Sequence, residues 1–324
     1  MDQPDREQEV SKAYQEDARP STGFSEEVAR QRFQETNFMK TINAISVGFL
    51  LLGSILLAKT ESFQPNVLFL SIDDLNDRVG FLDGHPQAKT PNMDALAKRG
   101  RNFTNAHCSV PVCTSSRNSV MSGIGPMTHG SYEIGPKYEE LPALADAPTI
   151  QRYFKDHGYQ TFSGGKVLHH NFGGRLTDDI DKSLGRARSP SPKKPMTRPA
   201  SWSGAWDWGA FPDEDAEMGD IQLAKSAAMA LKEKYDKPFF MSVGFFLPHV
   251  PCYATQKWHD LYSKVELPPV QFDDREDTPR FSWYLHWKLP EPRLKFLQEA
   301  NEWENLVRSY MACTSFVDSQ VGRL

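Results

Sequence analysis

The sequence predicts an α/β fold with a mainly parallel central sheet flanked by helices. Three observations lead to this prediction. Continuous apolar runs suit strands that are buried on both faces, the segments between them have the composition of helices, and the two kinds alternate along residues 65–324. Hydrophobic residues make up 39% of the 324-residue chain, which is enough for a packed core.

The first predicted elements follow one another closely. Residues 66–72 (NVLFLSI) are an apolar run rich in branched side chains and predict a buried strand. Residues 90–100 predict a helix that Thr90 can cap, with proline in its first turn and glycine at its end. Residues 102–108 (NFTNAHC) predict the next strand, and residues 148–158 predict a second helix that ends at glycine.

The rest of the chain continues the alternation. Residues 159–167 (YQTFSGGKV) predict a strand that leads into a glycine loop. Residues 181–215 are rich in Pro, Ser and Lys and then in Trp, so we expect a long surface excursion without elements of its own. A helix is predicted over 220–236, a buried strand over 237–246 and a last helix over 304–324. The last helix has no capping residue, which predicts a fold that continues past it.

The N-terminus differs in character from the rest. Residues 1–38 are polar and aperiodic and predict a disordered or non-native extension. Residues 39–62 predict a signal peptide that starts at Met39, because the fourteen-residue apolar run 45–58 is shorter than the ~20 residues of a spanning helix. A retained membrane anchor and a buried helix are the alternatives. The signal peptide predicts an exported protein.

Charge and cysteine content exclude several classes of protein. The formal net charge of −5 provides no basic field, so we expect no nucleic-acid partner. The four cysteines, Cys108, Cys113, Cys252 and Cys313, match no zinc-binding spacing and are too few for a disulfide scaffold. Their pairing and the oligomeric state stay open.

Asp73 and Asp74 follow the first predicted strand, at the sheet edge where α/β proteins bind ligands. Two adjacent carboxylates repel each other unless a cation lies between them, and their oxygens suit Ca²⁺ or Mg²⁺. A solvated turn is the plainer explanation of an isolated pair.

Cys113 opens a predicted helix and Arg117 lies one turn later. We expect the helix N-terminus to stabilise a thiolate there and Arg117 to hold an anionic group, although a buried structural cysteine is the commoner case. Lys166 and His169 follow the paired glycines of GGKVLHH, and His249 lies between two prolines. Each of these three, taken alone, is explained equally by a surface lysine or a structural histidine.

Taken in order, these motifs resemble the sulfatase family of the alkaline-phosphatase-like superfamily over residues 65–324. The segments GKVLH and PHVP are most similar to the iduronate-2-sulfatase branch. SFVDSQVGRL is similar to the helix that precedes the second half of the family's metal site. The resemblance implies hydrolysis of a sulfate monoester, on a sugar or glycan, in a periplasmic, secreted or lysosome-like compartment.

The resemblance also implies a role for each site residue. Cys113 would be oxidised to formylglycine by a formylglycine-generating enzyme, and its hydrate would attack sulfur through one oxygen and expel sulfate with the other. Asp73 and Asp74, with the modified Cys113, would bind Ca²⁺ in preference to Mg²⁺.

The remaining site residues are all basic. Arg117 would hold the hydrate and the carboxylates, and His169 would orient the hydrate or assist its proton transfer. Lys166 and His249 would contact the sulfate.

The sequence departs from the family pattern at Ser115, where proline or alanine is usual, and at Leu247, where the iduronate branch has lysine. The second half of the metal site would lie past Leu324. Two alternatives therefore remain: a phosphate or phosphonate ester hydrolase on the same scaffold, and an inactive truncated paralogue that binds glycans. The tryptophans of residues 202–208 suit sugar stacking or core packing equally.

Overall fold

The computed structural model of the chain describes residues 64–169, 175–197, 206–267, 269, 276, 278–280 and 294–324. The extension expected over residues 1–38 and the signal peptide expected over 39–62 lie outside these residues and stay predictions. Within the described ranges, no helix combines the length and apolar character needed to cross a bilayer.

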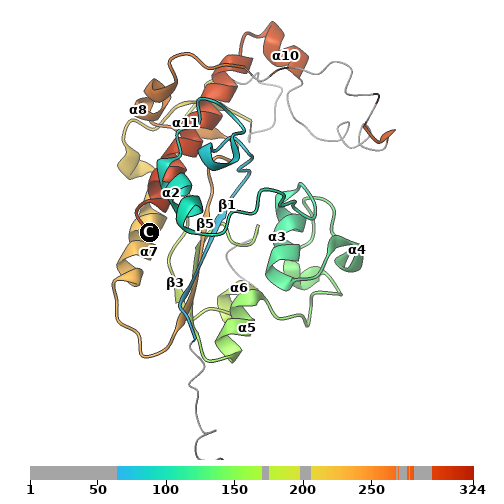
Figure 1. Ribbon diagram of the computed structural model, residues 1–324. Helices are drawn as coiled ribbons and strands as arrows, with labels where there is room; N and C mark the ends of the chain where they lie inside the picture. Colours follow the sequence, from blue (N-terminus) through green and yellow to red (C-terminus); the bar gives the residue numbers. More distant parts are fainter. Residues whose placement is uncertain are drawn as a thin grey trace, which may run out of the picture. The chain divides into compact units, whose positions relative to one another are not determined.

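The described part of the central sheet has four parallel strands in the order β1-β5-β2-β3 (Figure 1). The strands are β1 (Val67–Ile72), β2 (Gln160–Gly165), β3 (Lys182–Ser183) and β5 (Phe239–Phe245). Every residue of β5 is buried, as expected for the middle of a parallel sheet. A smaller parallel pair is formed by β4 (Trp208–Ala210) and β6 (Cys252–Ala254).

Helices cover both faces of this sheet. In Figure 1, α7 and α11 lie on one side of β1 and β5, and α3 and α5 lie on the other. The α-helices are α2 (Pro91–Arg99), α3 (Cys113–Ser122), α4 (Pro126–His129), α5 (Ile150–Asp156), α6 (Arg175–Asp178), α7 (Gly219–Leu231), α8 (Gln256–His259), α10 (Leu294–Glu299) and α11 (Trp303–Val321). Short 3₁₀ turns are η1 (Gly80–Leu82), η2 (Tyr138–Glu140), η3 (Asp215–Glu217) and η4 (Asp260–Tyr262).

The main core lies between the sheet and α7 with α11. The buried residues Leu223, Ala224 and Ala227 of α7 recur at helical spacing and face the sheet, and their small alanines let the helix pack closely. Large side chains such as Phe245 and Phe316 are fully buried in the same cluster, and each stabilises the fold by about 1.5–3 kcal/mol. The predicted α/β class is therefore confirmed.

Most predicted elements are present, and two expectations are wrong. Residues 102–108 form no strand, because their polar side chains give no face to bury, and Phe103 is 76% exposed. The segment 181–215 is not free of elements, since it contributes β3 and β4. Trp208 of this segment is 1% exposed in the core, while Trp202 lies outside the described residues.

The N-terminus of α2 is held from a distant part of the chain. The Thr90 hydroxyl does not cap it as predicted, because its Oγ1 accepts from the Gly80 N–H and donates to Asp94. Instead, the Asp318 carboxylate of α11 accepts from the backbone N–H groups of Asn92 (3.1 Å) and Met93 (2.8 Å). Helix α11 therefore anchors the helix that follows the first strand.

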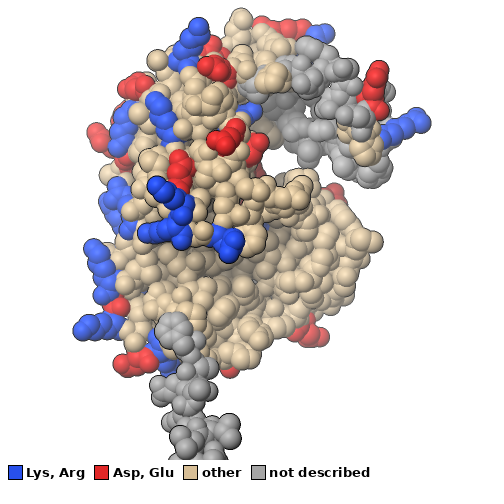
Figure 2. Space-filling model, viewed as in Figure 1, with Lys and Arg blue, Asp and Glu red and all other residues tan. Residues whose placement is uncertain are grey.

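Charges of both signs are interspersed on the face shown in Figure 2, over the region of α2 and α7. The part of that face over α3 and α4 carries few charged side chains. This face therefore has no wide basic surface of the kind that nucleic-acid-binding proteins use.

Candidate active site

The predicted site residues gather at one edge of the sheet. Asp73 and Asp74 follow β1, Lys166 follows β2 and His249 follows β5, so parallel strands bring all of them to their carboxyl ends. The backbone there is tightly packed: Lys166 N donates to Gly244 O (2.7 Å), and a Cβ at Gly244 would overlap the Lys166 carbonyl. Glycine at this position of β5 therefore permits the close approach of Lys166.

Asp73 is the centre of a buried charge cluster. Its side chain is 4% exposed, with Oδ1 2.7 Å from Arg117 Nη2 and Oδ2 in contact with Lys166 Nζ. Burial works to raise the pKa of Asp73, but the charges of Arg117 and Lys166 outweigh it and hold this pKa below its usual value. The carboxylate is therefore ionised between two cations.

Arg117 ties α3 to the ends of two strands. Besides Asp73, its guanidinium donates to the carbonyl oxygens of Lys166 and Val167. Its Nε is buried and has no hydrogen-bond partner among the described residues. Most of the N–H groups of Arg117 thus donate to protein acceptors. In this structure Arg117 therefore holds the Asp73 carboxylate in place and has few donors left for a ligand.

Cys113 and His169 form the second part of the site. Cys113 is the first residue of α3, and its Sγ lies 3.1 Å from Nδ1 of His169. Burial, with the nearby charges of Asp73 and Asp74, raises the pKa of Cys113 against the opposing effect of Lys166. The helix N-terminus acts in the expected direction, since the Thr114 N–H lowers this pKa, but burial outweighs it. The unmodified side chain is therefore a neutral thiol. All four cysteines of the chain have free thiols.

Asp74 and His249 face each other across the site. His249 donates from Nδ1 to the Val250 carbonyl, and its Nε2 lies 3.8 Å from Oδ2 of Asp74. Asp74 has a left-handed backbone (φ 55°) and a side chain that is 54% exposed, and its carbonyl accepts from the Tyr310 hydroxyl. Desolvation and the Asp73 charge raise the pKa of Asp74, although His249 works to lower it.

These carboxylates fit a hard divalent cation in their donor chemistry. Ca²⁺ binds about six to eight oxygen ligands, and Asp73 and Asp74 would supply part of that set. Desolvation and then the charge of Asp73 raise the pKa of Asp74, and a bound cation would oppose both because it favours the ionised carboxylate. Within the described residues, no group of three or more His, Cys, Asp or Glu side chains is placed to hold a metal.

Asp220 holds the backbone next to the site, and nothing in the sequence singles it out. It is 0% exposed in the first turn of α7, and its two oxygens accept from the N–H groups of Phe246 (2.9 Å) and Leu247 (3.0 Å). Burial raises the pKa of Asp220 to about 7. The carboxyl group therefore fixes the backbone that leads from β5 to His249.

A cavity of about 450 Å³ lies at this edge of the sheet. Lys166, His169 and His249 line it, with Phe246, Pro251 and Tyr253 as apolar and aromatic walls. The segment 186–191 lines it as well, including Arg186 and Arg188. Sequence reasoning missed these two arginines because they lie in the segment expected to be a surface excursion.

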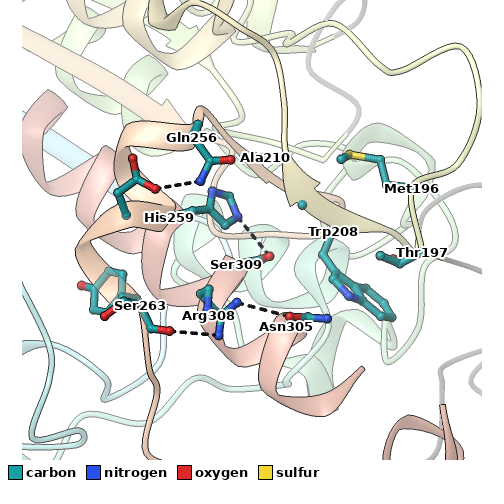
Figure 3. A pocket seen from close by; sticks show the side chains of 13 residues that line it. Met196, Thr197, Trp208, Ala210, Gln256, His259, Ser263, Asn305, Arg308 and Ser309 are labelled. Atoms are coloured by element: carbon teal, nitrogen blue, oxygen red, sulfur yellow. Dashed lines mark hydrogen bonds between the residues drawn. The ribbon is translucent and has the colours of Figure 1, made fainter. Parts of the chain in front are cut away.

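A second cavity, of about 410 Å³, shares no lining residue with the first (Figure 3). Its polar side chains bond one another: His259 Nε2 lies 3.1 Å from Ser309 Oγ, and Arg308 donates to Asn305 and to the Ser263 carbonyl. Burial lowers the pKa of His259, which favours the neutral ring. We assign this cluster to the packing of α8 against α11.

The two departures from the family pattern have different surroundings. Ser115 is 0% exposed, and its Oγ lies 3.0 Å from Ser131 Oγ and 3.3 Å from the Glu133 carbonyl. Leu247 is 3% exposed and belongs to the hydrophobic core. Ser115 is thus held within the polypeptide, and Leu247 offers no polar group to a ligand.

Comparisons with known proteins show the family to which the chain belongs. The sulfatase family model matches residues 65–324. The chain is 34% identical to a sulfatase of Formosa agariphila, over 85% of this chain and 59% of that protein. It is 28% identical to human iduronate 2-sulfatase, over 84% of this chain and 53% of that protein. The chain thus spans a little over half the length of these curated relatives.

The fold is also found in solved structures. A phosphonate monoester hydrolase of Agrobacterium radiobacter superimposes with a TM-score of 0.58 at 18% identity, over 80% of this chain and 58% of that one. At this identity the likeness concerns the fold alone.

Proposed function

Because this chain belongs to the sulfatase family, we propose that its full-length protein hydrolyses sulfate monoesters on sugars or glycans. One observation carries the proposal. Lys166, His169 and His249 line a single cavity, with the Cys113 sulfur 3.1 Å from His169 and with Asp73 and Asp74 beside Lys166 and His249. This arrangement supplies both a nucleophile position and cations for an anionic ester.

In the proposed reaction, Lys166 and His249 contact the sulfate group and stabilise negative charge on the leaving alcohol. Cys113 provides the nucleophile after its oxidation to formylglycine by a formylglycine-generating enzyme. His169, next to the Cys113 sulfur, holds or accepts the proton of the nucleophile. Arg117 keeps Asp73 ionised and in place.

Asp73 and Asp74 would hold Ca²⁺, with the oxidised Cys113 as a further ligand. The ion would supply positive charge beside the sulfate oxygens and the nucleophile. The support is the oxygen donor set of the two adjacent carboxylates and the exposure of the Asp74 side chain, which leaves its oxygens accessible to an ion.

A sulfated sugar as substrate is supported by the similarity to human iduronate 2-sulfatase. Export to a periplasmic, secreted or lysosome-like compartment rests on the predicted signal peptide over residues 39–62.

A phosphate or phosphonate ester hydrolase is the second candidate. It stays open because the fold shared with the phosphonate monoester hydrolase is compatible with either ester. Anion-binding cations at the sheet edge serve either ester, so the fold does not choose between them. Rates on 4-nitrophenyl sulfate and 4-nitrophenyl phosphate decide the question, and faster phosphate hydrolysis would favour this second reading.

The central test is the mass of the peptide that contains Cys113, taken from the full-length protein. We expect the aldehyde or its hydrate in place of the thiol, together with sulfate release that Cys113→Ala abolishes. Cys108→Ala, which removes an exposed thiol five positions earlier, is the matched control and should keep the activity. An unmodified Cys113 with no sulfate release would instead support the inactive, glycan-binding alternative that Ser115 motivates.

A further inference from the structure

Residues 186–191 are fixed against the site cavity by bonds on both sides. Gly185 continues the pairing of β3 with β2, since its carbonyl accepts from Gly165 N (2.9 Å). Ser189 Oγ accepts from Gly219 N (3.0 Å) at the start of α7, and a Cβ at Gly219 would overlap the backbone of Arg188. The segment is therefore seated between the end of β2 and α7.

Two arginines of this segment line the cavity. Arg186 and Arg188 are both exposed, and Ala187 between them lines the cavity and also packs against the main core. No carboxylate among the described residues forms an ion pair with Arg188.

The cavity therefore carries cations at two depths. Lys166, which is 8% exposed, lies deep beside Asp73, and the exposed Arg186 and Arg188 lie at the rim. Phe246, which is half-buried, lines the same cavity and offers aromatic surface to a sugar ring. A volume of about 450 Å³ lies within the range of ligand pockets in proteins.

We infer that Arg186 and Arg188 bind a second anionic group of the substrate, a carboxylate or a second sulfate, while Lys166 and His249 hold the sulfate ester. The guanidinium group presents paired donors that match either anion. This inference rests on the proposed function and narrows it, because it selects sugars that carry at least two negative charges. Arg186 and Arg188 then determine specificity without touching the reacting atoms.

The test compares two double variants of the full-length protein. Arg186→Ala/Arg188→Ala removes the proposed subsite, and Lys193→Ala/Lys194→Ala removes the same charge from two exposed residues that follow the segment and do not line the cavity. Calorimetry measures binding of a disaccharide with one uronate carboxylate and one 2-O-sulfate, in a Cys113→Ala background that prevents turnover. Hydrolysis of 4-nitrophenyl sulfate, which has one charge, is measured in the unaltered background.

We expect the arginine double variant to bind the disaccharide about 10- to 100-fold more weakly, as for the loss of one or two hydrogen bonds to a charged group. Its kcat/KM on 4-nitrophenyl sulfate should fall by a much smaller factor than its affinity for the disaccharide, and the lysine variant should match the wild type in both assays. Equal loss in both double variants, or no loss in the arginine variant, would overturn the inference.

Two further ligands identify the anion. A carboxyl-reduced disaccharide that binds the wild type as weakly as the arginine variant assigns the subsite to the carboxylate, and recovery of affinity by a second sulfate assigns it to sulfate. If the wild type hydrolyses no sulfate ester, the proposed function fails, and the binding comparison still decides whether the arginines form an anion subsite.

Discussion

Replacing Asp220 with asparagine should change how the stability of the protein depends on pH. The Asp220 carboxyl is fully buried in α7 and accepts two backbone N–H bonds from the loop that carries His249. Burial raises its pKa from 3.8 to about 7, so the folded protein keeps a proton that the unfolded chain releases. Asparagine has nearly the same shape and cannot ionise.

The expected magnitude follows from the two pKa values. Below about pH 4 the group is protonated in both states, and its stabilising effect is fully present. As the pH rises towards 7, the unfolded state gains from ionisation at about 1.4 kcal/mol for each pH unit, so about 4 kcal/mol of stability is lost in total. Between about pH 5 and pH 8, Asp220 alone should account for a loss of about 3 kcal/mol.

Urea unfolding at these two pH values measures the effect. The wild type should lose about 3 kcal/mol more than Asp220→Asn as the pH rises, and the comparison cancels the contributions of all other groups. Asp213→Asn, which removes an exposed carboxylate, is the control and should follow the wild type. If Asp220→Asn lost as much stability as the wild type over this range, burial would not control the ionisation of Asp220.

Three further predictions concern the cation site and the α2 anchor. Asp74→Ala should lower kcat/KM on an aryl sulfate by at least about 100-fold, since several kcal/mol of charge stabilisation depend on a held cation; undiminished turnover would contradict a shared cation. A chelator should stop hydrolysis and Ca²⁺ should restore it better than Mg²⁺, whereas full activity in chelator would argue against a metal. Asp318→Ala should lower the free energy of unfolding by about 2–4 kcal/mol, because Asn92 and Met93 lose a buried acceptor. Ser319→Ala is its control in urea unfolding, and an equal effect of the two variants would refute the cap.

Two strands of the central sheet could be predicted from the sequence because each is a continuous apolar run. Residues 66–72 and 237–246 correspond to β1 and β5, but only β5 is buried along its whole length, whereas β1 is half-buried throughout. The strand predicted over residues 102–108 is absent, because one aromatic side chain, Phe103, is not enough to create a buried face. The position of β5 between β1 and β2 depends on packing across the whole chain and has no local signal.

The residues at strand ends could also be predicted, because the order of their motifs is distinctive and the strands converge at one edge. Asp220 could not, since an acidic residue in the first turn of a helix usually reflects the helix dipole and looks the same whether exposed or buried. The arginines at the cavity rim could not be predicted either. Their position depends on how the chain after β3 continues along the end of β2. Only two residues of β3 pair with β2, and they give no sign of this in the sequence.

The strand order has a consequence for biosynthesis. β5 is made long after β1 and β2, and the bond between Phe239 N and the Asn66 side chain joins residues 173 positions apart. Until β5 leaves the ribosome, the edges of β1 and β2 that it will occupy stay unpaired in the nascent chain, open to other polypeptides. Closing so long a loop is slow, so the newly synthesised protein should depend on chaperones. We expect overproduction to fail at this stage of folding.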